Sequence, residues 1–306
     1  MVQQVVPAVQ GDGSAEPAEA PTGLAEPAEA LSNPSRRVRP HWRRELLLLV
    51  VLYLLYGAIR NLAPDQVVDA QRNARAILGA EGLLGMDVER TINLAGAALP
   101  WLAIPANYYY ATMHMAVTAA VLVWLYRRRP AHYARTRAVL LTMTLMALVC
   151  YWLYPLAPPR LMTGGGYIDT GRVFTLWGVT PSDDLVALSN QYAAMPSMHV
   201  GWALWCGVAV VMLAQRRVVR VLGALYPVLT LAVVVVTGNH FVLDGVAAMA
   251  LFALASVIVT AGMGRMALGA LRRGVVERGD GVVVERAAGV VPEPAADVGA
   301  DVGARE

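Results

Sequence analysis

The strongest constraint on this fold is a series of apolar stretches, each about 15–25 residues long, that carry almost no charge. A helix needs about 20 such residues to cross the hydrocarbon core of a bilayer. We therefore predict an all-α, polytopic membrane protein with six transmembrane helices, at roughly 45–60, 105–126, 136–155, 198–214, 219–237 and 241–263. The composition agrees, because 57% of the residues are hydrophobic, whereas soluble domains contain about 45–50% apolar residues.

The arginines predict how these helices are oriented. All 25 basic residues are arginines, and they gather before the first span and after the second, fourth and sixth spans. Because cytoplasmic loops are enriched in positive charge, we expect both termini in the cytoplasm and the first, third and fifth loops outside. We expect the first span to be an uncleaved helix rather than a signal peptide. The lack of lysine, beside abundant Ala, Val and Gly, suggests a GC-rich bacterial genome and hence a bacterial plasma membrane.

The regions outside the spans differ in character. Residues 1–40 are rich in Ala, Pro and Glu and are expected to form a disordered cytoplasmic tail, as are residues 266–306. The membrane domain then covers 41–265. Within the first outer loop, residues 65–99 mix apolar and charged residues at helical spacing, which predicts one or two helices on the outer membrane surface. The loop at 156–197 is too long for a turn, and loops of that length are often functional.

Three outward-facing segments contain the residues that can carry chemistry. They are YPLAPPRLM at 154–162, MPSMH at 195–199 and TGNHFVLDG at 237–245. In the last, His240 and Asp244 are four residues apart, so a helix places them on one face. A carboxylate there can accept the imidazole N–H, fix the tautomer and leave the other nitrogen free to attack.

The other two segments predict a phosphate site. Ser197 is a suitable helix cap, and a helix start offers unpaired N–H groups to an anion. Arg160 adds a planar cation that matches phosphate geometry. With one of the histidines His199 and His240 as nucleophile and the other as proton donor, this set predicts phosphoryl transfer through a phosphohistidine, with fixed cations and amides in place of a metal. His114, in the outer half of the second span, is either a substrate contact or a histidine that packs between helices.

The paired motifs resemble a known family. Pro-Ser-x-His, followed some forty residues later by His-x-x-x-Asp, is similar to the type 2 phosphatidic acid phosphatase superfamily, over about residues 100–264. The resemblance implies a six-helix core in which His240 is the nucleophile, Asp244 supports it and His199 is the general acid. It also implies that Ser197 binds phosphate.

The departures from the family pattern bear on the substrate. Leu153 and Leu161 stand where the first motif has a lysine and a proline, and Val233 and Val234 stand where the third has Ser-Arg. Met198 replaces the glycine of the second motif. The resulting pattern looks more like the inositol phosphorylceramide synthase-like branch, which transfers a phospho-headgroup between lipids. A site that lacks two cations also suits a singly charged phosphodiester better than a doubly charged monoester.

The sequence is compatible with several functions. The predicted activity is that of a membrane lipid phosphotransferase acting on a phospholipid or lipid-linked phosphate. The first alternative is a lipid phosphate phosphatase that uses water as acceptor. A proton-coupled transporter would be expected to show paired repeats, and a zinc hydrolase would need a glutamate base that the motifs lack. We expect no cofactor, no metal and no nucleic-acid partner, and the sequence does not predict the oligomeric state.

Overall fold

The computed structural model of the protein describes residues 41–61, 66–86, 88–174 and 190–287, without the side chains of residues 60, 61 and 266–287. The expected tail at 1–40 lies outside the described residues. Where the second tail is expected, the last helix runs on to Ala287, and residues 288–306 lie outside the description.

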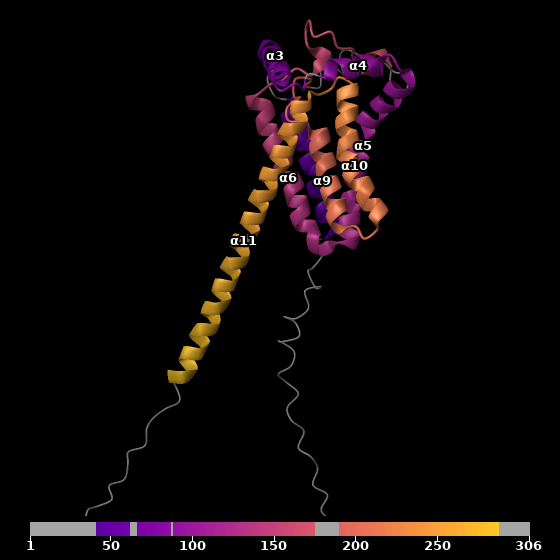
Figure 1. Ribbon diagram of the computed structural model, residues 1–306. Coiled ribbons are helices and arrows are strands. Elements are labelled where there is room, and N and C mark those ends of the chain that lie inside the picture. Colours follow the sequence, from indigo (N-terminus) through magenta and orange to yellow (C-terminus); the bar gives the residue numbers. More distant parts are fainter. Residues whose placement is uncertain (1–40, 62–65, 87, 175–189, 288–306) are drawn as a thin grey trace, which may run out of the picture. The chain divides into compact units, whose positions relative to one another are not determined.

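The described residues form helices, with one isolated β-bridge between Leu156 and Ala193. The long helices are α5, α6, α9, α10 and α11, preceded by α2, α3 and α4. Two short elements, η1 and α7, lie in the segment after α6 (Figure 1). The bounds are α2 Trp42–Asn61, α3 Val67–Leu83, α4 Glu89–Ala97, α5 Pro100–Arg128, α6 Pro130–Leu153, η1 Pro159–Leu161, α7 Thr170–Val173, α9 Met198–Leu213, α10 Arg217–Val236 and α11 Val242–Ala287.

Helix α9 is the centre of the packing, since it contacts α5, α6, α10 and α11. It meets α10 very closely: a Cβ atom built on Gly207 would lie 2.5 Å from the carbonyl oxygen of Gly223. Glycine is therefore required at this crossing, because any larger side chain would push the helices apart. The main cluster of buried apolar side chains lies around α9 and includes Leu125, Met143 and Trp205.

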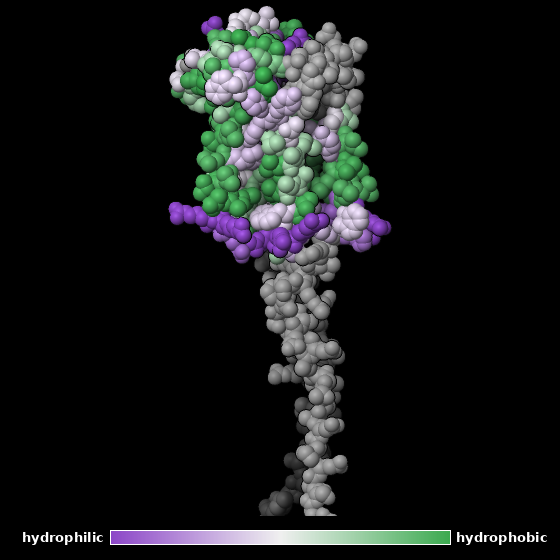
Figure 2. All heavy atoms as spheres, turned by 90° about the vertical axis from the view of Figure 1, so that its right-hand side faces the viewer, coloured by the Kyte–Doolittle hydropathy of each residue, from purple (hydrophilic) through white to green (hydrophobic). Residues whose placement is uncertain are grey.

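Four of the described helices are long and apolar enough to cross a membrane: Pro100–Arg128, Pro130–Leu153, Arg217–Val236 and Val242–Arg265. They correspond to the second, third, fifth and sixth expected spans. The other two expected spans fall on α9, which is apolar but has only 16 residues, and on α2, whose first turn is charged. Figure 2 shows an apolar band on the side of the molecule facing the viewer, with hydrophilic residues along one edge.

Helix α2 is attached to α6 at two levels. The carboxylate of Glu45 accepts hydrogen bonds from Tyr133 and Arg137. The indole N–H of Trp152 donates to the carbonyl oxygen of Ile59 over 3.2 Å. Much of the rest of α2 exposes leucine, valine and tyrosine side chains.

The helices α3 and α4 lie at the end of the bundle where α9 and α11 begin (Figure 1). Side-chain amides fasten α3 to the segment that follows α6. Gln71 donates to the carbonyl oxygen of Leu161 over 2.7 Å and accepts from the N–H of Thr163 over 2.9 Å. Asn73 donates to the carbonyl oxygen of Pro155 over 2.8 Å. This end of the bundle holds the candidate site.

Candidate active site

His240 and Asp244 form a buried pair at the start of α11. The Nδ1 atom of His240 lies 3.1 Å from Oδ2 of Asp244, and the two residues are 5% and 0% exposed. The same carboxylate oxygen accepts the N–H of Phe241 over 3.1 Å. With Nδ1 held by the carboxylate, Nε2 is the nitrogen of His240 that remains for chemistry. The structure brings this predicted pair together.

A tight turn places His240. Gly238 adopts a φ of +68°, which L-residues with a side chain rarely take. Behind it, the N–H groups of Asn239 and His240 both lie within hydrogen-bond distance of the carbonyl oxygen of Val234, at 2.9 and 3.2 Å. The chain therefore reverses directly after α10, and backbone hydrogen bonds hold His240 in place at this turn.

His199 occupies the first turn of α9, opposite His240. The centroids of the two imidazole rings are 5.9 Å apart. Ser197 caps α9, since its hydroxyl oxygen accepts the N–H of Val200 over 3.5 Å, and its own N–H donates to the carbonyl oxygen of Asp244 over 3.0 Å. Ser197 is fully buried and does not line the cavity described below. Its cap role is thus observed, and its contact with phosphate stays a prediction.

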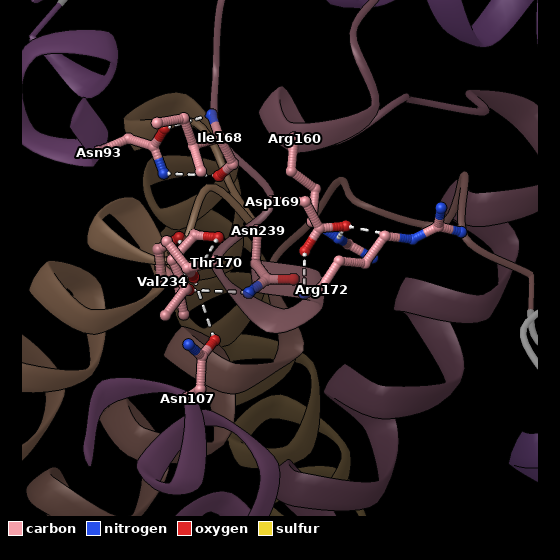
Figure 3. A network of polar contacts seen from close by, with 10 residues as sticks. Asn93, Asn107, Arg160, Ile168, Asp169, Thr170, Arg172, Val234 and Asn239 are labelled. Atoms are coloured by element: carbon pink, nitrogen blue, oxygen red, sulfur yellow. Dashed lines mark hydrogen bonds and ion pairs between the residues drawn. The ribbon is translucent and has the colours of Figure 1, made fainter. Parts of the chain in front are cut away.

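Arg160 is held beside the turn by its backbone and by an ion pair. Its N–H donates to the carbonyl oxygen of Gly238 over 2.9 Å. Its Nε lies 3.5 Å from Oδ2 of Asp169, and both side chains are about one-fifth exposed. Figure 3 shows Asp169 between Arg160 and Arg172, whose Nε lies 3.9 Å from the same oxygen. The arginine predicted to bind phosphate thus already has an anionic partner, which sequence reasoning missed.

Two asparagines fix the segment that carries Asp169 (Figure 3). Asn93 of α4 accepts the N–H of Ile168 over 2.8 Å, and it donates to the carbonyl oxygens of Ile168 and Val236. Asn107 of α5 accepts the hydroxyl of Thr170 over 3.1 Å. These contacts bind α4, α5, the end of α10 and the Asp169 segment to one another.

The two histidines and Arg160 line one cavity with a volume of about 270 Å³. Its other walls come from α2, α5, α6 and the segment before α9, and aromatic side chains are prominent among them. They include Tyr53, Tyr56, Tyr110, Tyr151 and Trp202. A cavity of this size, lined by aromatic rings together with three imidazoles and a guanidinium, can hold a phosphorylated headgroup.

His114 lies in this cavity wall beside His199. The two rings meet edge to face with centroids 4.3 Å apart, and Tyr110 stacks on His199 at 4.1 Å. The Nδ1 atom of His114 lies 3.1 Å from the carbonyl oxygen of Tyr110. The structure thus places His114 of α5 against His199 of α9, as a histidine packed between helices would lie, and a direct substrate contact stays a prediction.

The two positions where the family pattern has basic residues are apolar and point elsewhere. Val234 is 1% exposed and packs with Val200, Ala248 and Tyr110. Leu153 ends α6 with its side chain 77% exposed, and neither residue lines the cavity. Among the residues that the structure describes, Arg160 is the one arginine in the cavity wall.

Two buried glutamates near the site were not identified from the sequence. Glu81 of α3 accepts the N–H of Leu243 over 2.8 Å, and Glu89 of α4 accepts the N–H of Val242 over 3.0 Å. Burial, together with the neighbouring Glu89, raises the pKa of Glu81 to about 8. The sequence gives no clear signal for their burial, because both acids lie in a segment that mixes apolar and charged residues and was expected to form helices on the membrane surface.

The described residues contain no group of three or more His, Cys, Asp or Glu side chains arranged to hold a metal ion. The zinc-hydrolase alternative therefore finds no ligand set in that part of the chain. Cys150 and Cys206 are both free thiols, one half-buried and one buried.

Fold and site together define a helical membrane protein with a histidine–aspartate pair, a second histidine and an arginine around one cavity. The sequence model of the PAP2 superfamily matches residues 75–258, more than half of the chain. The chain belongs to this superfamily, and membership supports a phosphatase-type enzyme acting on lipid phosphates. The match does not extend to the inositol phosphorylceramide synthase-like branch. Comparison with curated proteins and with solved structures finds no match.

Proposed function

We propose that the protein is a metal-independent lipid phosphotransferase that works through a phosphohistidine on a phosphodiester or lipid-linked phosphate. The observation that carries this proposal is the charge of the cavity. Its arginine, Arg160, is already paired with Asp169, and the other two family cation positions hold Leu153 and Val234. This sparse positive charge matches a singly charged phosphodiester.

The chemistry follows from the positions of the two histidines. Nε2 of neutral His240 attacks phosphorus, the P–N bond forms, and the bond from phosphorus to the leaving oxygen breaks. His199, in its protonated form, gives that oxygen its proton. Asp244 stabilises the positive charge that develops on His240 through Nδ1–H.

The second half of the reaction returns both histidines to their starting states. An acceptor hydroxyl attacks phosphorus as neutral His199 takes its proton, and the P–N bond breaks. A lipid alcohol as acceptor gives headgroup transfer, and water gives hydrolysis. Superfamily membership favours hydrolysis as the second candidate function, while the charge of the cavity favours transfer from a diester.

For the membrane arrangement, we propose six spans, α2, α5, α6, α9, α10 and α11, with α3 and α4 at the outer surface. The arginine-rich turns α5–α6 and α9–α10 would then face the cytoplasm together with both termini. The cavity lies at the opposite end, which would be extracytoplasmic in a bacterial plasma membrane. The apolar side chains exposed along α2 support its assignment as a span.

The test uses the purified full-length protein in detergent with EDTA. Phosphatidylinositol and phosphatidic acid are supplied separately, each with and without a lipid alcohol. His240→Ala is the inactive variant, and His132→Ala, at the opposite end of the bundle on α6, is the matched histidine control. Headgroup transfer that requires the alcohol and His240 supports the proposal. Phosphate release from phosphatidic acid alone would identify a phosphatase and refute the charge argument.

A further inference from the structure

The first turn of α11 is held by three carboxyl groups from three different helices. Asp244 accepts the N–H of Phe241, Glu89 that of Val242 and Glu81 that of Leu243, over 2.8–3.1 Å. Helix starts leave their first N–H groups without partners in the helix, and here three of these groups are satisfied by side chains. This turn follows His240 directly, so the glutamates support the backbone that carries the predicted nucleophile.

The burial of these glutamates is unusual for acidic residues. Glu81 is 0% and Glu89 1% exposed, and Oε2 of each has no hydrogen-bond partner among the described residues. Among those residues, no arginine or histidine forms an ion pair with either glutamate. Glu89 from α4 and Asp244 from α11 lie close enough to Glu81 to raise its pKa, and both are acidic. Two adjacent buried carboxylates without a cation would repel each other strongly.

We propose that Glu81 and Glu89 are positioning residues that share one proton and, in that singly charged state, hold the turn bearing His240 and Asp244 in its catalytic geometry. The shared proton lies between the two carboxyl groups, while Oε1 of each accepts an N–H group of α11. The remaining negative charge lies at the positive end of the helix dipole, where it is stabilised.

The proton gives this pair a pH dependence. Burial and the neighbouring Glu89 raise the pKa of Glu81 to about 8. Below that pH the pair carries one charge. Above it the pair carries two, next to the carboxylate of Asp244, and repulsion drives α3, α4 and α11 apart. The alkaline limit of activity is therefore set by these glutamates, away from the cavity.

A plain helix cap is the alternative role, and substitutions distinguish the two. Glu81→Gln keeps an oxygen for the N–H of Leu243 and cannot lose a proton. If Glu81 acts only as a cap, this variant alters activity by the same factor at every pH. If the pair shares a proton, the variant changes the pH profile itself. Asp69→Asn is the matched control, because Asp69 is a partly exposed acid on the same helix that pairs with Arg72.

The first measurement is an infrared titration of the full-length protein in detergent, which needs no substrate. We expect a protonated carboxylic acid band below pH 8 that disappears as the pH passes about 8. The band should be lost in Glu81→Gln and titrate at lower pH in Glu89→Gln, whose remaining acid has lost its anionic neighbour. It should be unchanged in Asp69→Asn. A wild-type band that is absent, or that survives in Glu81→Gln, overturns the shared proton.

The second measurement concerns positioning and rests on the proposed function. We expect wild-type kcat to fall about tenfold per pH unit above the ionisation, and Glu81→Gln to shift this limb upward by about one unit or more with KM unchanged. An unshifted limb overturns the positioning role. If no substrate reacts, histidine NMR replaces kinetics, with the His240 signal assigned by its loss in His240→Ala. That signal should change across the ionisation in wild type and not in Glu81→Gln, and an equal change in both overturns the role.

Discussion

The ion pair between Arg160 and Asp169 makes the preference for a phosphodiester testable by one isosteric change. Asp169→Asn removes the negative charge beside Arg160 and leaves an oxygen that can still accept the N–H of Arg172, as Asp169 Oδ1 does over 3.2 Å. Asparagine is also a good helix cap. The change therefore alters the charge of the site more than its shape.

The expected size follows from Coulomb's law. A phosphate bound to Arg160 would lie roughly 7 Å from the Asp169 carboxylate, where each unit of phosphate charge is repelled by about 2 kcal/mol at an effective dielectric constant of about 20. A doubly charged monoester then gains about 2 kcal/mol more than a singly charged diester, or about 30-fold in relative kcat/KM. Because Asp169 is about one-fifth exposed, screening by water and salt lowers this to about fivefold.

The assay compares kcat/KM for phosphatidic acid and phosphatidylinositol in wild type, Asp169→Asn and Arg172→Gln. We expect the monoester-to-diester ratio to rise about five- to 30-fold in Asp169→Asn, and less at high salt. Arg172→Gln controls for loss of the exposed partner of Asp169, and it should lower the ratio slightly. A ratio that stays constant, or moves toward the diester, in Asp169→Asn refutes the reasoning that the charge of the cavity selects the substrate.

Three further predictions concern the catalytic pair, the helix crossing and metal dependence. Asp244→Asn should lower kcat about 10³–10⁴-fold, because the amide no longer fixes the His240 tautomer. Steady-state kinetics measure the effect, and circular dichroism checks that the variant is folded. A kcat within tenfold of wild type would contradict the prediction. Gly207→Ala should destabilise the protein by about 1–3 kcal/mol, because the new methyl group would collide with Gly223. The measurement is a lower Tm. Gly262→Ala is the control, because its Cβ would meet nothing within 4 Å. EDTA should leave the rate unchanged. A loss of activity in EDTA that added zinc restores would contradict the metal-independent phosphohistidine mechanism.

The sequence predicted that His240 and Asp244 lie together because only three residues separate them. The expected geometry differs from the observed one: α11 begins at Val242, so His240 reaches Asp244 from the turn before the helix and not from a face of the helix. His199 could be predicted to lie nearby only through the arginine pattern, which assigned all three motifs to one side of the membrane. The distance between the two histidines depends on how α9 and α11 pack, which spacing along the chain does not encode.

The contacts that sequence reasoning missed depend on long-range packing. Asp169 is close to Arg160 along the chain, but the segment that carries Asp169 is fixed by hydrogen bonds from Ile168 to Asn93 and from Thr170 to Asn107. Glu81 lies 162 residues from Leu243, whose N–H it accepts. In a single sequence such acids are typical of a solvated helix face. The burial of Glu81 and Glu89 follows only from the packing of α3 and α4 on α11.

The packing around Val234 bears on the family arginine that is missing at this position. An arginine is absent there, and the space is occupied by Tyr110, which packs against Val234 and stacks on His199. An aromatic ring that stacks on the predicted general acid thus packs beside the position where the family pattern has a cation. Introducing arginine at this position would require Tyr110 to move.

The amide contacts of Asn93 have a practical consequence for dividing or tagging this protein. One side chain joins α4 to Ile168 and to Val236, which are 75 and 143 residues further along the chain. The segments that Asn93 joins are therefore fixed to one another, although they are far apart along the chain. A reporter domain inserted at Gly165 would disrupt these contacts, whereas one inserted between Gln215 and Arg216, at the opposite end of the bundle, would leave them intact.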